Sequence, residues 1–194
     1  MGEKAGWSWR GKGLFFWIFL VGVALDLGSK AWAFHMEIPF SLGGPPVRWL
    51  LDHWLGLTHT QNPGAIWGIG GGMSGLLVVI RLVVLFFVLG FLLRMPRDRK
   101  LAHAALGLIS AGAVGNLVDN LSNRAGGFTW NVAELLKSPG TVRDFIHVDL
   151  GFWPFHPWPD FNAADSMILI GVLLLVLFHP TQKKGSGKSP AASR

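Results

Sequence analysis

Four long apolar segments constrain the fold of this 194-residue chain more than any other feature. They cover residues 14–34, 76–93, 101–118 and 163–178. Each approaches the roughly 20 residues that a helix needs to cross the hydrocarbon core of a bilayer. Backbone N–H and C=O groups find no water there, so a crossing segment must satisfy them within a helix. We therefore predict an all-α membrane protein built on a four-transmembrane-helix bundle.

The composition fits this setting. Apolar residues make up 51% of the chain and charged residues only 14%, whereas about a quarter of the residues in soluble domains are charged. The absence of Cys excludes disulfides, thiolate chemistry and Cys-based metal sites. The seven His residues form no recognisable ligand motif such as His-Glu-x-x-His. We therefore predict neither a metal site nor a cofactor.

The basic residues predict how the bundle is oriented. Eleven Lys and Arg residues lie before the first segment, between the second and third, and after the fourth, whereas the other two loops hold four. Because the cytoplasmic loops of membrane proteins are enriched in Lys and Arg, we predict that both termini are cytoplasmic. These anchors explain the net charge of +6, and we predict no nucleic-acid partner.

This orientation divides the chain into three parts. Residues 1–13 form a cytoplasmic N-terminal segment, residues 14–179 the four-span domain, and residues 180–194 a disordered basic cytoplasmic tail rich in Gly, Ser and Lys. Two long outer loops, at about residues 35–75 and 119–162, form a small extracytoplasmic β/loop subdomain. Long loops of this kind are usually functional.

Local patterns predict two short elements within the outer loops. Residues 55–67 mix apolar and polar side chains before a Gly-rich turn, and we predict short strands there. Residues 129–137 are predicted to form a short interfacial helix with Trp130, Ala133 and Leu136 on one face.

Two aspartates that border apolar sequence are the leading candidates for a functional site. Residues 142–150 alternate, so that Asp144 would be the only polar group on an apolar strand face. Asp165 leads directly into the fourth segment. A carboxylate near lipid is costly, so such residues are functional candidates, and two that face each other can share a proton, as in aspartic proteases. The competing interpretation of Asp165 is a favourable first-turn acid behind Asn162 as the helix N-cap.

Other polar residues allow two interpretations each. Asp26 and Lys30, spaced i, i+4 in the first segment, form either a self-neutralising ion pair or a pair that binds substrate or a lipid headgroup. Asn116 and Asp119, at the outer end of the third segment, either solvate the helix end or position a nearby site. Asn62 is either an ordinary turn residue before Pro-Gly or a site residue.

Five sequence runs, in order along the chain, resemble those of the lipoprotein signal peptidases, also called signal peptidase II. The runs are Asp26-Leu-Gly-Ser-Lys30, Asn62-Pro-Gly-Ala-Ile-Trp-Gly68, Gly112-Ala-Val-Gly-Asn-Leu-Val-Asp119, Val142-Arg-Asp-Phe145 and Phe161-Asn-Ala-Ala-Asp165. Each run alone is a weak signal. Together, on a four-span scaffold of matching orientation, they make a specific match over about residues 14–179.

The resemblance implies a metal-independent intramembrane aspartic endopeptidase of the bacterial cytoplasmic (inner) membrane, with its active site at the extracytoplasmic face. Its substrates would be prolipoproteins whose Cys already carries diacylglyceryl, cleaved just before that Cys. By motif, Asp144 and Asp165 become the catalytic residues. The residues expected to bind substrate or support the site are Asn62, Gly64, Asn116, Asp119, Asn162, Asp26, Lys30 and Arg124. We expect a monomer in contact with membrane lipids.

The chain departs from the family pattern in two ways. The Arg that follows the third-segment Asp in the family is Asn120 here, so its contact is either lost or supplied by Arg124. The stretch between Asp119 and Asp144 is also longer, by about residues 124–138, and we expect this insertion to reshape substrate access. Neither departure touches the two aspartates, so we expect activity.

A second interpretation is a small multi-span transporter or channel component. Asp26, Lys30, Arg81 and the two aspartates would then line a polar path. No internal repeat or pair of broken helices in the sequence supports this interpretation. Arg81 is more commonly explained by snorkelling or by packing against the bundle.

Overall fold

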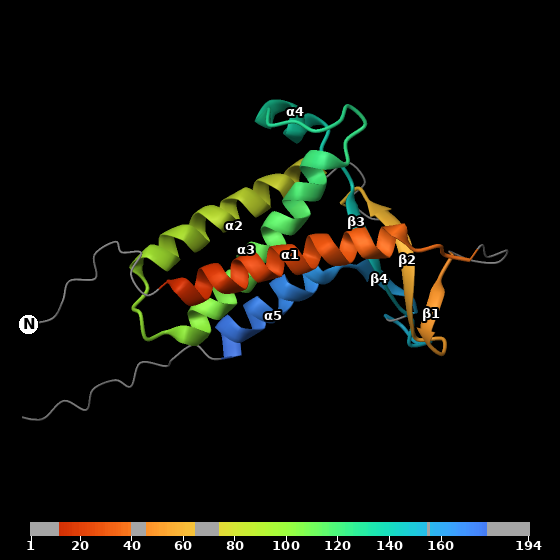
Figure 1. The fold of residues 1–194 in the computed structure, drawn as a ribbon, viewed down its shortest axis with the longest axis horizontal. Helices are drawn as coiled ribbons and strands as arrows, with labels where there is room; N and C mark the ends of the chain where they lie inside the picture. Colours follow the sequence, from red (N-terminus) through yellow and green to blue (C-terminus); the bar gives the residue numbers. More distant parts are fainter. Residues whose placement is uncertain (1–11, 40–45, 65–73, 155, 178–194) are drawn as a thin grey trace, which may run out of the picture.

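The computed structural model of the protein describes residues 12–39, 46–64, 74–154 and 156–177. Within these ranges, four longer helices form a bundle and four strands form a sheet at one end of it (Figure 1). The elements are α1 (Gly13–His35), β1 (Arg48–Leu51), β2 (Leu55–Asn62), α2 (Ser74–Arg94), α3 (Lys100–Ser122), α4 (Val132–Lys137), β3 (Val142–Val148), β4 (Trp158–Phe161) and α5 (Ala163–Leu177).

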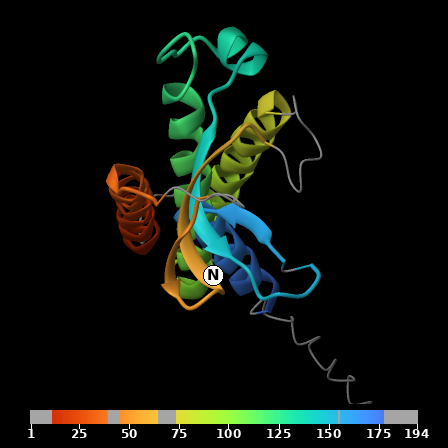
Figure 2. The same cartoon turned by 90° about the vertical axis from the view of Figure 1, so that its right-hand side faces the viewer.

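Helix α3 is the centre of the bundle. It packs most extensively against α5 and α1, and also against α2. Figure 2, seen from the sheet end, shows α1 and α2 on opposite sides of α3. Small residues of α3 make this close packing possible. A Cβ added at Gly112 would lie 2.3 Å from the Ala164 carbonyl oxygen, and one at Gly115 would lie 2.2 Å from Asp26 Oδ2.

Three of these helices, α1, α2 and α3, are long and apolar enough to cross a membrane. Helix α5 is apolar but has 15 described residues, which at 1.5 Å per residue is about 22 Å, less than the roughly 30 Å of a hydrocarbon core. The end of the predicted fourth span, Phe178, lies outside the described residues. Large apolar side chains, including Phe86 and Phe91 of α2, are mostly exposed on the bundle surface. A lipid environment explains this surface, and the chain is a multi-pass membrane protein.

The sheet confirms the predicted strands in the outer loops. Its order is β1-β2-β3-β4 and every neighbouring pair is antiparallel. Strand β2 falls within residues 55–67, and β3 falls within residues 142–150. Residues 65–73, which include the rest of the first range and the Gly-rich turn, lie outside the described part.

The predicted one-sided burial of β3 is only partly correct. Val142 and Asp144 are buried as expected, but Phe145 and His147, on the other face, are buried too. Strand β3 is an inner strand of the sheet, and Phe145 packs with Leu57 of β2 and Ala33 of α1. Both faces of β3 are therefore covered, and a simple alternation underestimates its burial.

The insertion contains a shorter helix than predicted. Asn131 caps α4 by accepting hydrogen bonds from the Ala133 and Glu134 backbone N–H groups. Because the helix begins after this cap, Trp130 lies outside it and is 78% exposed. The buried residue of α4 is Leu135, which packs with Val78 of α2 and Leu121 of α3. Trp130 therefore does not share a helical face with Ala133 and Leu136, and the predicted start of the helix at residue 129 is wrong.

The chain enters and leaves the bundle at the same end. Helix α1 begins and α5 ends at the end of the bundle opposite the sheet (Figure 1). The predicted terminal segments, residues 1–13 and 180–194, lie almost entirely outside the described ranges. Their cytoplasmic placement and the count of four spans stay predictions.

Candidate active site

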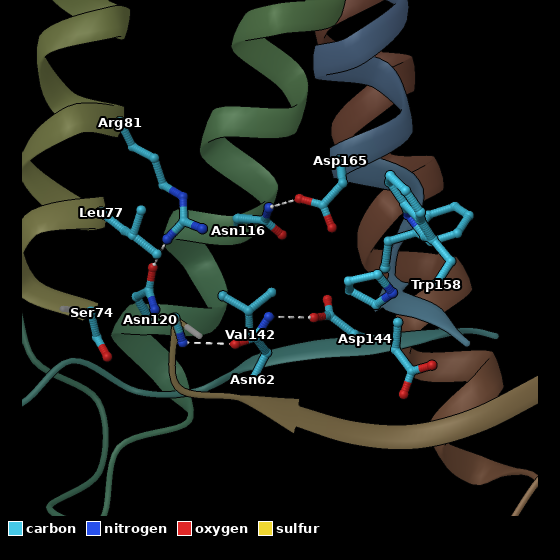
Figure 3. Close-up of a pocket in the computed structure, with 14 residues that line it drawn as sticks. Asn62, Ser74, Leu77, Arg81, Asn116, Asn120, Val142, Asp144, Trp158 and Asp165 are labelled. Atoms are coloured by element: carbon cyan, nitrogen blue, oxygen red, sulfur yellow. Dashed lines mark hydrogen bonds between the residues drawn. The ribbon is translucent and has the colours of Figure 1, made fainter. Parts of the chain in front are cut away.

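A cavity of about 330 Å³ opens where the sheet meets α2, α3 and α5 (Figure 3). The strands β2, β3 and β4, the helices α2, α3 and α5, and the turn after β2 contribute to its lining. The lining residues are Asn62, Gly64, Ser74, Leu77, Arg81, Asn116, Asn120, Val142, Asp144, Trp158, Pro159, Asp160, Phe161 and Asp165. Five residues predicted for the site are therefore brought together around one space.

Asp144 enters this cavity from β3 and is 2% exposed. Its Oδ1 accepts a hydrogen bond from Asn162 Nδ2 at 2.6 Å, and its Oδ2 accepts one from Asn62 Nδ2 at 2.9 Å. Burial, together with the nearby negative charge of Asp165, raises the pKa of Asp144 to about 7, although both amides favour its ionised form. Asp144 is thus an acid that exchanges its proton near neutral pH.

Asp165 reaches the cavity from the first turn of α5. Its Oδ2 accepts the Asn162 backbone N–H at 3.1 Å, while Asn162 Oδ1 accepts the Asp165 backbone N–H at 3.1 Å. This reciprocal pair is a capping box, which stabilises the start of the helix. The remaining oxygen, Oδ1, accepts a hydrogen bond from Asn116 Nδ2 at 2.8 Å. The capping interpretation of both residues is confirmed, and the same bonds aim the carboxylate at the cavity.

Two buried amides connect the two carboxylates. Asn162 Nδ2, which binds Asp144, lies 3.1 Å from Asn116 Oδ1, and Asn116 Nδ2 binds Asp165. Both amide side chains are at most 1% exposed. Since buried amides seldom move without losing hydrogen bonds, they fix the two aspartates relative to one another.

Asn62 and Gly64 form the turn that follows β2. The Gly64 backbone N–H donates to Asn62 Oδ1 at 2.8 Å, and the amide nitrogen of Asn62 donates to Asp144. Gly64 has a φ of +94°, a conformation that favours glycine. The turn interpretation of Asn62 is therefore correct, and the turn itself presents Asn62 to Asp144.

A buried charge cluster lies behind the cavity. The Lys30 ammonium binds Asp26 Oδ2 at 2.8 Å, Asp119 Oδ2 at 3.0 Å and Asn116 Oδ1 at 2.8 Å. Lys30, Asp26 and Asp119 are each 0% exposed. All three N–H groups of Lys30 are thus used, and Asn116 is held from behind.

The cluster joins two further elements, α5 and β3. Asp26 Oδ1 accepts the Ala164 backbone N–H of α5 at 2.9 Å. Asp119 Oδ1 accepts two bonds from the Arg143 guanidinium of β3, at 2.7 and 2.9 Å. Two cations and two carboxylates therefore neutralise one another. The predicted ion pair of Asp26 and Lys30 exists, but it ties α1 to α3 and α5 rather than only easing a helix end at the interface.

Arg124 has a different place from the one expected. Its guanidinium donates to the backbone oxygens of Ser138 and Gly127, and one nitrogen lies 3.8 Å from Glu134. These contacts hold the insertion together, and Arg124 is not among the residues that line the cavity. The guanidinium that binds Asp119 belongs to Arg143, because strand β3 runs beside the end of α3.

Arg81 is a cavity residue that the sequence did not reveal. It was interpreted as a snorkelling or packing residue, yet it lines the cavity and donates to Asn120 Oδ1 at 2.5 Å. The feature that could have indicated such a role is a charged residue one or two turns inside an apolar segment. The direction of the Arg81 side chain depends on how α2 packs on α3, which the sequence does not show.

The polar residues do not form a path along the bundle. Asp26 and Lys30 are enclosed and bonded to one another, whereas Arg81 and the two aspartates line a cavity at the sheet end. This arrangement does not favour a transporter. Among the residues that the structure describes, no group of three His, Cys, Asp or Glu side chains is placed to hold a metal ion.

Known proteins resemble this chain in sequence and in fold. The sequence pattern of the family described as Signal peptidase (SPase) II matches residues 18–180. The lipoprotein signal peptidase of Geobacillus kaustophilus (strain HTA426) is 30% identical over 175 residues, which cover 89% of this chain and 98% of that protein. That of Anaeromyxobacter sp. (strain Fw109-5) is 34% identical over 143 residues, which cover 70% of this chain and 58% of that protein.

A solved structure agrees with these sequence matches. A bacterial membrane enzyme, determined by the in meso method at 2.3 Å resolution, aligns with a TM-score of 0.66 and 25% identity. The alignment covers 91% of this chain and 94% of that structure. The five motif runs, the matched family and the shared membrane fold agree, and the chain belongs to the signal peptidase II family.

Proposed function

We propose that this protein is an aspartic endopeptidase that removes signal peptides from diacylglyceryl-modified prolipoproteins, cleaving just before the lipid-modified Cys. Membership of the signal peptidase II family supports the protease activity and the prolipoprotein substrate. The observation that carries the aspartic mechanism is the convergence of Asp144 and Asp165 on one cavity, where each is held by buried amides.

The two carboxylates divide the chemistry between them. Asp144, with its pKa raised to about 7, retains a proton near neutral pH. Asp165 takes a proton from a water molecule as that water attacks the scissile carbonyl carbon. Asp144 donates a hydrogen bond to the carbonyl oxygen on which negative charge develops. When the C–N bond breaks, a proton passes to the leaving amine, and the pair returns to one shared proton.

The rest of the site keeps this pair in position. Asn62 and Asn162 bind the two oxygens of Asp144, so the carboxyl group cannot rotate away. Asn116, held by Lys30, fixes Asp165 from the other side. Precise placement of reacting groups lowers the barrier because little orientation entropy remains to be lost.

The membrane delivers the substrate. We propose that both termini lie in the cytoplasm, that α5 completes a fourth span, and that the cavity faces the extracytoplasmic side of the bacterial inner membrane. A prolipoprotein held by its acyl chains and its signal helix would then reach the cavity by lateral diffusion, already oriented. We further propose that a single copy of the chain is sufficient, because every residue assigned to the mechanism comes from one chain.

Incubation of the purified full-length protein with a diacylated prolipoprotein tests this function. We expect cleavage on the N-terminal side of the lipid-modified Cys, and its loss in Asp144→Asn and in Asp165→Asn. Asp52→Asn, at an exposed carboxylate between β1 and β2, is the matched control and should cleave normally. Full cleavage by either site variant would remove the aspartic mechanism. Ion or solute flux through sealed vesicles without proteolysis would favour a transporter instead.

A further inference from the structure

Arg81 stands on the wall of the cavity opposite the two aspartates. It projects from α2, two turns after the start of the helix at Ser74, and Leu77, one turn before it, lines the same wall (Figure 3). The carboxylates of Asp165, Asp144 and Asp119 all lie within its electrostatic range. A cation is thus directed into the space that a substrate would fill.

The part of the chain that the structure describes uses the guanidinium of Arg81 incompletely. Among the described residues its hydrogen bond is the one from Nη1 to Asn120 Oδ1, at 2.5 Å, and no described carboxylate lies within 4.0 Å of it. Arg carries five N–H donors. A half-buried cation with a neutral partner and spare donors is costly unless another acceptor joins it.

Position 120 connects this residue to the family pattern. The pattern carries Arg after Asp119, and this chain carries Asn120, which also lines the cavity. Asn120 is fixed by a 2.6 Å bond from its Nδ2 to the Gly140 carbonyl oxygen, and it accepts the bond from Arg81. A guanidinium therefore occupies the corner of the cavity at position 120, but it is supplied by α2 instead of α3.

We propose that Arg81 is a substrate-positioning residue that donates hydrogen bonds to a carbonyl oxygen of the lipid-modified substrate. The acceptor is a neutral dipole, because the carboxylates around the cavity would repel an anion. Two parts of the substrate carry such oxygens: the peptide backbone near the cleaved bond, and the ester groups of the diacylglyceryl. The proposal rests on the proposed function for the identity of the substrate.

Binding to an inactive protein tests this role without requiring turnover. The probe is a fluorescent lipopeptide with a diacylglyceryl Cys, and the full-length protein carries Asp144→Asn. Since a hydrogen bond from a charged donor is worth about 1.5–3 kcal/mol, we expect Arg81→Leu to raise the Kd by about 10- to 150-fold. Arg81→Lys keeps the charge and should lose several-fold at most. The control Arg48→Leu removes an exposed Arg of β1 and should leave the Kd unchanged.

Two further arms locate the acceptor and separate binding from packing. A probe with ether-linked chains lacks the ester carbonyls. If Arg81→Leu no longer raises the Kd of this probe, the ester is the acceptor. If Arg81→Leu still raises its Kd, the peptide carbonyl is the acceptor. In the active protein, Arg81→Leu should raise KM and leave kcat within a few-fold. Asn120→Arg added to Arg81→Leu should recover most of the lost affinity.

Several outcomes would overturn the proposal. One is an unchanged Kd in Arg81→Leu. Another is an equal loss in Arg81→Lys and Arg81→Leu together with a lower melting temperature in both, which would assign a packing role. If the protein without substitutions does not cleave the lipopeptide, the proposed function fails. The Kd values with and without Arg81→Leu still decide whether Arg81 binds a carbonyl oxygen of the probe.

Discussion

Replacing Asp144 with Asn should reverse the relative stability of variant and wild type as the pH rises. Asp144 is 2% exposed, and its pKa in the folded protein is about 7, against an ordinary value of 3.8. The folded protein therefore holds a proton here that the unfolded chain has already released between these two values. Folding stability falls through that window as the pH rises, and it stays reduced above about pH 7.

The size of the effect follows from the shift. At 1.36 kcal/mol for each pKa unit, the interval from 3.8 to about 7 corresponds to a loss of roughly 4 kcal/mol in the free energy of unfolding. Asn at this position does not titrate, so the variant avoids that loss. The amide nitrogen of the new Asn faces the donor group of Asn62 or of Asn162, so one hydrogen bond is lost. This loss lowers the free energy of unfolding by about 1–2 kcal/mol at every pH. Asp144→Asn should thus be less stable at pH 4 and more stable at pH 8.

Thermal unfolding of both proteins in the same detergent, measured from pH 4 to pH 8, checks this expectation. Asp52→Asn makes the same atomic change at an exposed side chain and should follow the wild type throughout. The reasoning would be refuted by a constant difference in melting temperature between Asp144→Asn and wild type across the range. It would also be refuted if the variant lost stability relative to wild type as the pH rose.

Three further perturbations test other parts of the account. The rate constant kcat/KM should fall about tenfold per pH unit above about pH 7, as Asp144 loses its proton; a rate that stays constant to pH 9 would contradict the role of Asp144 as the acid. Lys30→Met leaves two buried carboxylates without their shared cation and should cost about 3–5 kcal/mol; the yield of folded protein, compared with that of the exposed Lys137→Met, measures the loss. Gly64→Ala places a Cβ 3.0 Å from Leu77 Cδ1 at a φ of +94°, which should lower the free energy of unfolding by about 1–3 kcal/mol. It should also slow cleavage, because the strained turn displaces Asn62. Gly126→Ala, whose added Cβ would meet nothing within 4 Å, should not slow cleavage.

The sequence singled out the two aspartates that line the cavity because a carboxylate is costly next to apolar segments. Asp144 and Asp165 border apolar segments, and the motif runs that contain them match a known family. For Asp165 and Asn162, the structural and functional interpretations had been set against each other. The capping box confirms the structural interpretation and is compatible with the functional one, since the bonds that start α5 also aim Asp165 at the cavity.

What the sequence could not predict depends on packing between distant segments. Arg81 faces the cavity because α2 lies against α3, and hydropathy alone does not give the direction of a side chain. Arg143 binds Asp119 because β3 passes the end of α3, and hydropathy does not show that this strand lies beside that helix. The start of α4 depended on its cap at Asn131, which leaves Trp130 outside the helix.

The most direct test of the proposed mechanism is whether Asp144 and Asp165 act as one catalytic unit. Single-turnover cleavage of a diacylated prolipoprotein should be measured for Asp144→Asn, Asp165→Asn and the double variant. If the two residues serve one proton-sharing step, either substitution alone should remove nearly all of the rate, about 10⁴-fold or more, and the second should add little. Losses that multiply in the double variant, or substantial cleavage by either single variant, would contradict a shared dyad.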